Sequence, residues 1–128
     1  MSEPSVRYEW RGVFGNDEAN ALHAEAFGTR VFTAEDWDWV TLTDRHSLGW
    51  VVARSTRGEV VGFVNVAWDG ADHAFLLDTK TRGPLQRRGI GAELVRCAAG
   101  HARAAGCEWL HVDFRSELAA FYLDACGF

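Results

Sequence analysis

The 128-residue chain is long enough to bury one hydrophobic core but too short for two, so a single domain over residues 1–128 is expected. Apolar residues at 48% and charged residues at 24% are typical of a globular chain and exclude a disordered one. A net charge of −5 argues against a nucleic acid partner. No apolar run has transmembrane length or resembles a signal peptide, so no membrane partner is expected.

The cysteines and histidines predict no metal site. Cys97, Cys107 and Cys126 are an odd number of thiols without metal-ligand spacing, which indicates reduced side chains in a cytoplasmic protein. The five histidines are too scattered along the chain to form a recognisable metal motif.

The start of the chain predicts one strand and one helix. Residues 6–11 alternate in polarity as a strand does. Asn16 or Asp17 is expected to cap a helix that runs to Phe27, where Gly28 suits a left-handed C-cap.

A second helix is expected to begin at Thr33. A threonine N-cap followed by Glu35 and Asp36 suits the positive end of a helix dipole. This helix would carry Trp37, Trp39, Val40 and Leu42.

The middle of the chain predicts three consecutive strands. Residues 50–53 and 60–67 flank the polar turn 55–59, which is the pattern of a hairpin. Residues 73–80 form a third strand after another polar turn. These strands are expected to pair antiparallel.

The second half adds a helix, a strand and a helix. Residues 92–105 have apolar positions at helical spacing, and residues 109–114 alternate as a strand does. Because a helix connects them, strand 109–114 is expected to run parallel to strand 73–80. A last helix is expected over 117–126, with Gly127 at its end. The order predicts an α+β fold whose sheet is mixed and mostly antiparallel.

The loop Gln86–Gly91 carries the chemistry that the sequence suggests most directly. Gly89 and Gly91 let the backbone pass close to a bulky ligand, where a Cβ would intrude. The helix that follows begins with unpaired N–H groups and a partial positive charge, which suit a pyrophosphate. Arg87 and Arg88 add charge for a further phosphate.

The same loop has a plain structural interpretation, a strand-to-helix turn whose glycines serve only its geometry. It is not a dinucleotide-binding fingerprint, because Gln86 occupies the place of the first glycine. It is not a P-loop either, because no Gly-Lys-Ser/Thr follows.

Two motifs together resemble the GNAT superfamily of acyl-CoA-dependent N-acyltransferases. Gln86, Gly89 and Gly91 match the family's Gln/Arg-x-x-Gly-x-Gly/Ala loop. The segment 121–128, which begins with Phe-Tyr and ends with Gly-Phe, is similar to the family's late aromatic signature. The resemblance is close from about Phe75 to the end and covers only element order before that.

The resemblance implies a sheet flanked by helices, with a splayed parallel strand pair that admits CoA. Acetyl-CoA would be the acyl donor, its pyrophosphate held by the loop and its pantetheine arm paired with the strand 77–80. The cofactor-binding residues that it implies are Leu77, Thr79, Gln86, Arg87, Arg88, Gly89, Ile90, Gly91 and Ala92.

The resemblance also implies catalytic roles. Tyr122 would be the general acid near the thioester sulfur, although a tyrosine on an apolar helix face is often a core residue. Asp78 is a candidate base, and a backbone N–H between Asp78 and Lys80 could stabilise the oxyanion. The alternatives for the base are a water chain, His73, His111, Asp113 and Glu117.

The chain departs from the family pattern in three places. Arg115 and Ser116 occupy the region ahead of the last helix where family members often have an asparagine. Pro84 lies two residues before Gln86, where family members more often have it three before. The chain stops at Phe128, where the family continues with one or two C-terminal strands. We therefore expect either a truncated product or a homodimer in which the neighbour completes the sheet.

The resulting hypothesis is an N-acetyltransferase that works by direct attack in a ternary complex. The acceptor would be a small-molecule amine or a protein amine. Aromatic residues on the first two helices would line its pocket or simply belong to the core; they are Phe27, Phe32, Trp37 and Trp39. The alternatives are a non-catalytic acyl-CoA-binding module and a degenerate interaction domain.

Overall fold

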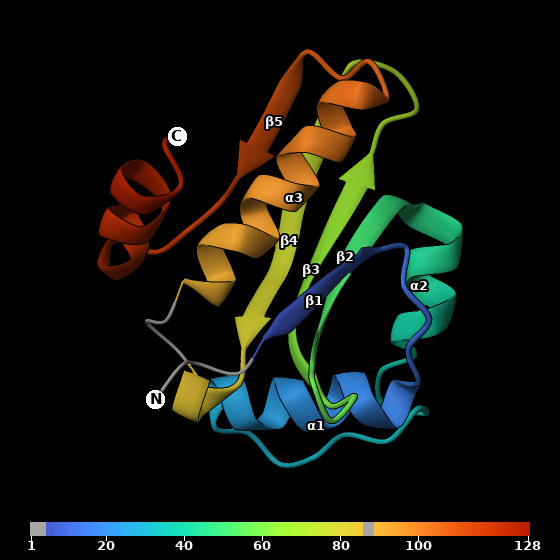
Figure 1. Ribbon diagram of the computed structural model, residues 1–128. Coiled ribbons are helices and arrows are strands. Elements are labelled where there is room, and N and C mark those ends of the chain that lie inside the picture. The colour runs from blue at the N-terminus through green and yellow to red at the C-terminus, as the bar shows by residue number, and fades with distance from the viewer. Residues whose placement is uncertain (1–4, 86–88) are drawn as a thin grey trace.

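A five-stranded sheet lies at the centre of the computed structural model, which describes residues 5–85 and 89–128 (Figure 1). The strands follow one another across the sheet in chain order. Neighbours pair antiparallel except for the last two, which are parallel. The strands are β1 (Val6–Trp10), β2 (Ser47–Ser55), β3 (Val60–Trp68), β4 (His73–Thr81) and β5 (Trp109–Val112).

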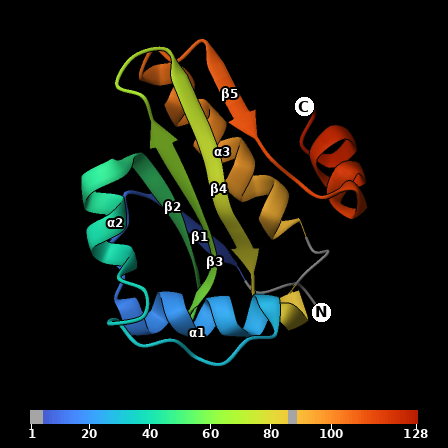
Figure 2. The ribbon, with the colours of Figure 1, turned by 180° about the vertical axis from the view of Figure 1, so that it is seen from behind.

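Helices cover both faces of this sheet (Figures 1 and 2). Helices α1 (Asn16–Phe27) and α2 (Trp39–His46) pack on one face, and α3 (Ile90–Ala104) packs on the other. Three shorter helical segments complete the described chain. They are η1 (Gly83–Leu85), η2 (Ser116–Leu118) and η3 (Ala120–Ala125).

The predicted order of elements and the mixed α+β sheet are confirmed. The crossover through α3 makes β4 and β5 parallel, as expected from a helical connection. Gly28 ends α1 with a left-handed φ of 67°. The last helix is not a single α-helix, because a 3₁₀ turn precedes a π-helical segment whose Cys126 N donates to Phe121 O at 2.9 Å.

The predicted start of the second helix is wrong. Thr33 N and Thr33 Oγ1 both donate to Asp36, and this closes a turn instead of opening a helix. The helix begins five to six residues later, where Asp38 is the N-cap and its carboxylate accepts from Thr41 N at 3.0 Å. Asp38 is also of a residue type that caps helices, but the sequence analysis placed the cap at Thr33 and did not identify it.

Two apolar layers hold the helices on the sheet. On the α3 face, helix residues Leu94, Val95 and Ala98 pack on the fully buried strand residues Val51, Val64 and Val66. On the other face the largest buried side chains are Trp39 of α2 and Phe63 of β3. Trp39 Nε1 donates to the buried Asn20 Oδ1 at 2.7 Å, which joins α2 to α1.

Strand β4 contains a bulge. Phe63 is opposite Lys80 and Asn65 is opposite Leu77, so three steps along β4 match two along β3. Asp78 within the bulge has a left-handed φ of 60°. Because side chains alternate along a strand, the extra residue turns Lys80 to the α1 and α2 face, where it meets Phe63.

The parallel pair separates halfway along β4. Its pairing runs from His73 opposite Trp109 to Leu76 opposite Val112, where β5 ends. Beyond that point no described strand pairs with β4 on its β5 side. The expected splay is therefore present, and it leaves the edge of Leu77–Lys80 open.

We predict that Gly62→Ala destabilises the fold by about 1–3 kcal/mol, as overpacking of a core does. A Cβ at this position would lie 2.9 Å from Leu94 Cδ1 and 3.1 Å from Ile90 Cγ2. Gly100→Ala, in the interior of α3 with nothing within 4 Å of its Cβ, is the control and should stabilise by about 0.5–1 kcal/mol. Urea unfolding of both variants measures this, and equal effects would contradict the packing of α3 on β3.

Candidate functional site

Three segments meet beyond the point where the parallel strands separate: the end of β4, the start of α3 and η3. A Cβ at Gly91 would lie 3.7 Å from Thr81 Oγ1 and 3.1 Å from two ring carbons of Phe121. The start of α3 therefore lies beside the end of β4, two residues after Thr79. Leu77 and Asp78 on β4 are exposed, and Thr79 is half-buried.

The N-terminus of α3 has no side-chain cap among the described residues. Gly89 is its N-cap, in a left-handed conformation with a φ of 84°, and no side chain of the described residues caps it. A helix start leaves its first amides without backbone acceptors, and here these belong to Ile90, Gly91 and Ala92. The predicted contacts of Gln86, Arg87 and Arg88 lie outside the described residues.

The two loop glycines have different structural causes. Gly89 is required by its positive φ, and nothing lies within 4 Å of a Cβ built on it. A Cβ at Gly91 would lie 3.1 Å from two ring carbons of Phe121, so this ring would have to shift. The expectation that a Cβ at Gly91 would intrude on a ligand stays a prediction.

Tyr122 is enclosed by aromatic rings. Only 7% of the residue is exposed. Its ring lies 5.0 Å from that of Phe114, 4.8 Å from Phe121 and 6.2 Å from Phe128, measured between centroids. The groups that act on Asp78 belong to α1, β3 and β4, so the structure gives the two predicted catalytic residues different surroundings.

The Asp78 carboxylate has a defined polar environment. Asn65, which is almost fully buried, donates a hydrogen bond to it and in turn accepts one from Ser47 Oγ. Desolvation by the surrounding protein raises the pKa of Asp78, although the residue as a whole is exposed. The Lys80 charge opposes this rise, and His23 and Asn65 oppose it further.

Sequence reasoning gave no role to the side chain of Lys80, the buried cation of this region. Its Nζ lies 3.7 Å from the ring centroid of Trp39 and 5.3 Å from that of Phe63. Burial lowers the pKa of Lys80 to about 8, against the opposing charge of Asp78. Burial also lowers the pKa of His23 on α1, and the Lys80 charge lowers it further. A bulge without a glycine leaves no signature in sequence, so the orientation of Lys80 was not predictable.

The aromatic residues of the first two helices divide between core and surface. Trp39 is buried, and Trp37 stacks on it at 5.1 Å between centroids while remaining 44% exposed. His23 contacts the rings of Phe27 and Phe32 at 4.8 and 5.5 Å. The core interpretation therefore holds for Trp39, and Trp37 presents an aromatic face to solvent.

The remaining candidate bases lie elsewhere. His73 and His111 face each other across the paired half of β4 and β5, with Nδ1 and Nε2 2.6 Å apart. Asp113 and Glu117 are exposed in the connection from β5 to η2 and within η2. Asp78 is the candidate within the bulge itself.

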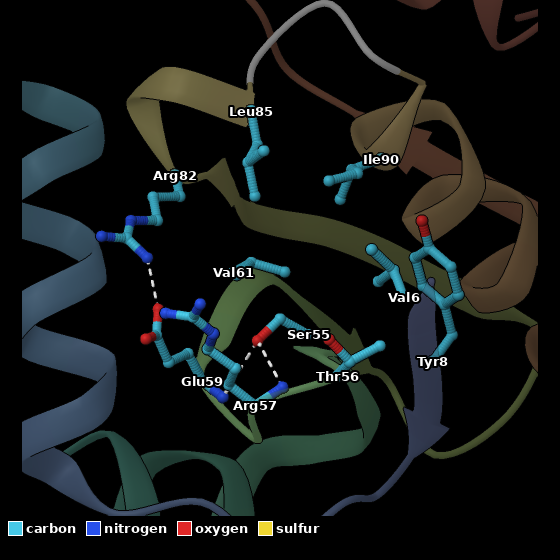
Figure 3. Close-up of a pocket in the computed structure, with 10 residues that line it drawn as sticks. All are labelled: Val6, Tyr8, Ser55, Thr56, Arg57, Glu59, Val61, Arg82, Leu85 and Ile90. Atoms are coloured by element: carbon cyan, nitrogen blue, oxygen red, sulfur yellow. Dashed lines mark hydrogen bonds and ion pairs between the residues drawn. The ribbon is translucent and has the colours of Figure 1, made fainter. Parts of the chain in front are cut away.

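A cavity of about 610 Å³ opens beside the start of α3 (Figure 3). Its apolar floor includes Val61 and Ile90, and its rim carries Arg82, which pairs with Glu59 and Glu25. Ile90 is the one described cofactor-binding candidate that lines it.

Over residues 5–85 and 89–128 no cluster of three or more acidic, histidine or cysteine side chains is arranged to hold a metal. No helix in these residues combines the length and apolarity needed to cross a membrane.

A model of the acetyltransferase (GNAT) family matches residues 13–128. No curated protein sequence matches the chain significantly.

Solved structures that resemble the chain share its fold at low sequence identity. A GNAT family acetyltransferase from Streptococcus pneumoniae is 22% identical, with a TM-score of 0.72 over 97% of this chain and 87% of that one. The aminoglycoside N-acetyltransferase AAC(6')-Iy, bound to the bisubstrate analogue CoA-S-monomethyl-acetylneamine, is 16% identical, with a TM-score of 0.75 over 97% and 90%. Glucosamine-6-phosphate N-acetyltransferase from Arabidopsis thaliana is 17% identical, with a TM-score of 0.70 over 95% and 91%.

We predict that Gly91→Val destabilises the fold by about 1–3 kcal/mol because the new side chain displaces the Phe121 ring. In a Phe121→Ala background the same change should cost less, with a coupling of at least about 0.5 kcal/mol. Gly100→Val, elsewhere on α3, should show no coupling to Phe121. A double-mutant cycle by urea unfolding measures this, and additive effects at Gly91 would mean that η3 does not dock there.

Proposed function

We propose that this chain, which belongs to the acetyltransferase (GNAT) family, transfers an acetyl group from acetyl-CoA to a primary amine by direct attack in a ternary complex. One observation carries the proposal. The open edge of β4, beyond its last pairing with β5, lies beside a helix N-terminus that no described side chain caps. An extended amide-rich arm and an anion are the two groups that such a junction can bind.

The described residues fit CoA in two ways. The first amides of α3 would hold the pyrophosphate, and the backbone of Leu77–Lys80 would pair with the pantetheine arm as a further strand would. Gln86, Arg87 and Arg88 would add side-chain contacts to phosphate. Structures of related fold bound to CoA or to a CoA-containing bisubstrate analogue support this placement. The free thiols of the chain support a cytoplasmic location.

The chemistry divides among the residues of the junction. Bound acetyl-CoA supplies the reactive thioester. An aliphatic ammonium with a pKa of about 10 must lose a proton before it attacks, and Asp78 would accept that proton. Backbone amides at the bulge would donate to the developing oxyanion, a contact worth roughly 3 kcal/mol. The Tyr122 hydroxyl would supply a proton to the departing sulfur.

The acceptor would approach on the α1 and α2 face, where Asp78 and the exposed ring of Trp37 lie. We propose a small-molecule amine or a protein amine as the acceptor class. The aminoglycoside and glucosamine-6-phosphate N-acetyltransferases of related fold support the small-molecule alternative. An aromatic face can also hold a cationic amine by a cation–π contact.

A second candidate function is acyl-CoA binding without turnover. The enclosure of Tyr122 by Phe114, Phe121 and Phe128 favours it, because such packing is also what a purely structural tyrosine shows. The same CoA contacts serve both functions, so catalysis must be tested separately from binding.

We predict that acetyl-CoA binds the chain and that Arg87→Ala with Arg88→Ala weakens binding roughly tenfold or more, since each phosphate contact involves a charged group. Arg103→Ala, in the last turn of α3, removes a similar charge far from the loop and is the matched control. Calorimetric titration gives the affinities. A folded chain that does not bind acetyl-CoA would contradict the proposed function, and equal affinity in both variants would contradict the phosphate contacts.

We predict that Tyr122→Phe lowers kcat by about 10²–10⁴-fold, the usual contribution of a general acid, and leaves CoA affinity nearly unchanged. Release of free CoA thiol across a panel of amines measures kcat. A chain with turnover in which Tyr122→Phe has no effect would reduce Tyr122 to a core residue. A chain that binds CoA but acetylates no amine supports the second candidate.

A further inference from the structure

Lys80 is buried where an ordinary ion pair does not account for it. Only 3% of the residue is exposed, and no described residue accepts a hydrogen bond from its Nζ. Lysine is almost never fully buried unless it is paired, because desolvating an ammonium is costly. The aromatic faces of Trp39 and Phe63 compensate part of that cost.

Asp78 is the carboxylate nearest to Lys80 in sequence, and the Lys80 charge acts to lower its pKa. Lys80 and Asp78 influence each other's ionisation across the bulge, each favouring the charged form of the other. The bulge is what places them together, because it turns Lys80 to the face of the sheet that carries Asn65 and Leu77.

Asn65 orients the carboxylate independently. Its side-chain oxygen accepts from Ser47 Oγ, which leaves its amide hydrogens for Asp78. Asn65 is 1% exposed, so its side chain has little freedom. Two buried side chains therefore favour the ionised form of Asp78: Asn65 on β3, as a hydrogen-bond donor, and Lys80 on its own strand, as a cation.

The other elements packed here leave Lys80 as the effective cation for Asp78 within the described part of the chain. On α1 the facing titratable group is His23, whose pKa is lowered by burial and by Lys80, so it is neutral near pH 7. On α2 and β3 the facing side chains, Trp39 and Phe63, are uncharged. Arg82, also near α1, pairs with Glu25 and Glu59 instead.

We propose that Lys80 is a positioning residue of the acyl-transfer site: its buried ammonium keeps the Asp78 carboxylate ionised and in place at the bulge, so that Asp78 can accept the proton of the acceptor amine. This inference rests on the proposed function. Lys80 touches neither substrate. It acts through Asp78.

The proposal sets the pH dependence of kcat at saturating substrates. Activity requires ionised Asp78, which gives the acid limb of the profile. Activity also falls when Lys80 loses its proton near its pKa of about 8, because the Asp78 carboxylate, although still ionised, is then no longer held in place by a cation. The profile is therefore a bell whose alkaline limb lies below the pKa of about 10 of an aliphatic amine.

Two substitutions at Lys80 separate its charge from its bulk. Lys80→Met keeps an unbranched apolar stem without charge, and should move the acid limb to higher pH by about one unit, as loss of a nearby opposite charge does. It should also lack the alkaline limb near pH 8, with kcat staying at the lower level that the wild type reaches once Lys80 has lost its proton. Lys80→Arg, which stays charged at every accessible pH, should restore the acid limb and also lack the alkaline limb. Arg103→Met is the control for loss of a distant positive charge.

The measurements are pH profiles of kcat, CoA affinity by calorimetry, and direct titration of the Asp78 carboxyl by carbon NMR in wild type and Lys80→Met. We expect the acid limb and the NMR pKa to rise together, with CoA affinity within about twofold of wild type as evidence of an intact site. If the chain acetylates an amine but the acid limb and NMR titration of Lys80→Met match wild type, the proposal is overturned. If Lys80→Arg behaves like Lys80→Met, charge is not the cause, and the proposal is also overturned.

Failure of the proposed function has a different signature. In that case wild type itself binds no CoA or acetylates no amine, before any change at Lys80 is made. The role of Asp78 as a base then falls together with that function. An intact wild-type activity combined with an unshifted Asp78 instead contradicts only the role of Lys80.

Discussion

One extra residue in β4 determines on which face of the sheet the charged side chain of Lys80 lies. Without the bulge, Phe63 would be opposite Thr79, and Lys80 would point into the layer that Leu94 and its neighbours on α3 fill. With it, Lys80 packs on Trp39, and the α3 face stays apolar. The left-handed φ of Asp78 is the local expression of the same insertion. The position of the candidate base and of its cation thus follows from the register between β3 and β4.

The end of β5 contributes the second half of the arrangement. Strand β5 stops at Val112, opposite Leu76, whereas β4 continues for another five residues. On its β5 side, no described strand pairs with this part of β4. The bulge lies in that unpaired stretch, so the strained residue and the open edge coincide. The start of α3 lies beside the end of β4, and there Phe121 of η3 packs on Gly91. An unpaired strand edge, a helix start without a described side-chain cap and the Asp78 carboxylate therefore lie in one region of the fold.

Sequence periodicity predicted most of the architecture. The strand before the glycine loop and the helix after it were expected at 73–80 and 92–105, and they lie at His73–Thr81 and Ile90–Ala104. The periodicity of a long amphipathic segment rests on many residues, so a single atypical residue hardly changes its predicted position. The helix expected at Thr33 shows the opposite case. It begins after Asp38, and Asp38 and Trp39 both bond to α1, through Asn16 and Asn20, in contacts that local sequence does not reveal.

The site was less accessible to sequence reasoning than the fold. The glycine loop located the start of α3, but the contact between Gly91 and Phe121, thirty residues away in the chain, could not be predicted from the loop. Asp78 was identified as a candidate base from its strand alone. Its partners Asn65 and Lys80 depend on cross-strand register and on a bulge, and neither is encoded by the spacing of residues within one element.

The site concentrates features that work against stability. Asp78 in the left-handed region costs of order 1 kcal/mol, although aspartate tolerates that region better than most residues. Lys80 Nζ is buried without a hydrogen-bond acceptor among the described residues, and contact with two aromatic rings offsets only part of its desolvation. An apolar side chain at this position would pack against Trp39 and Phe63 without that cost. Backbone strain at Asp78 and a desolvated cation at Lys80, two residues apart on a strand with an unpaired edge, are costs of the kind that proteins carry at functional sites.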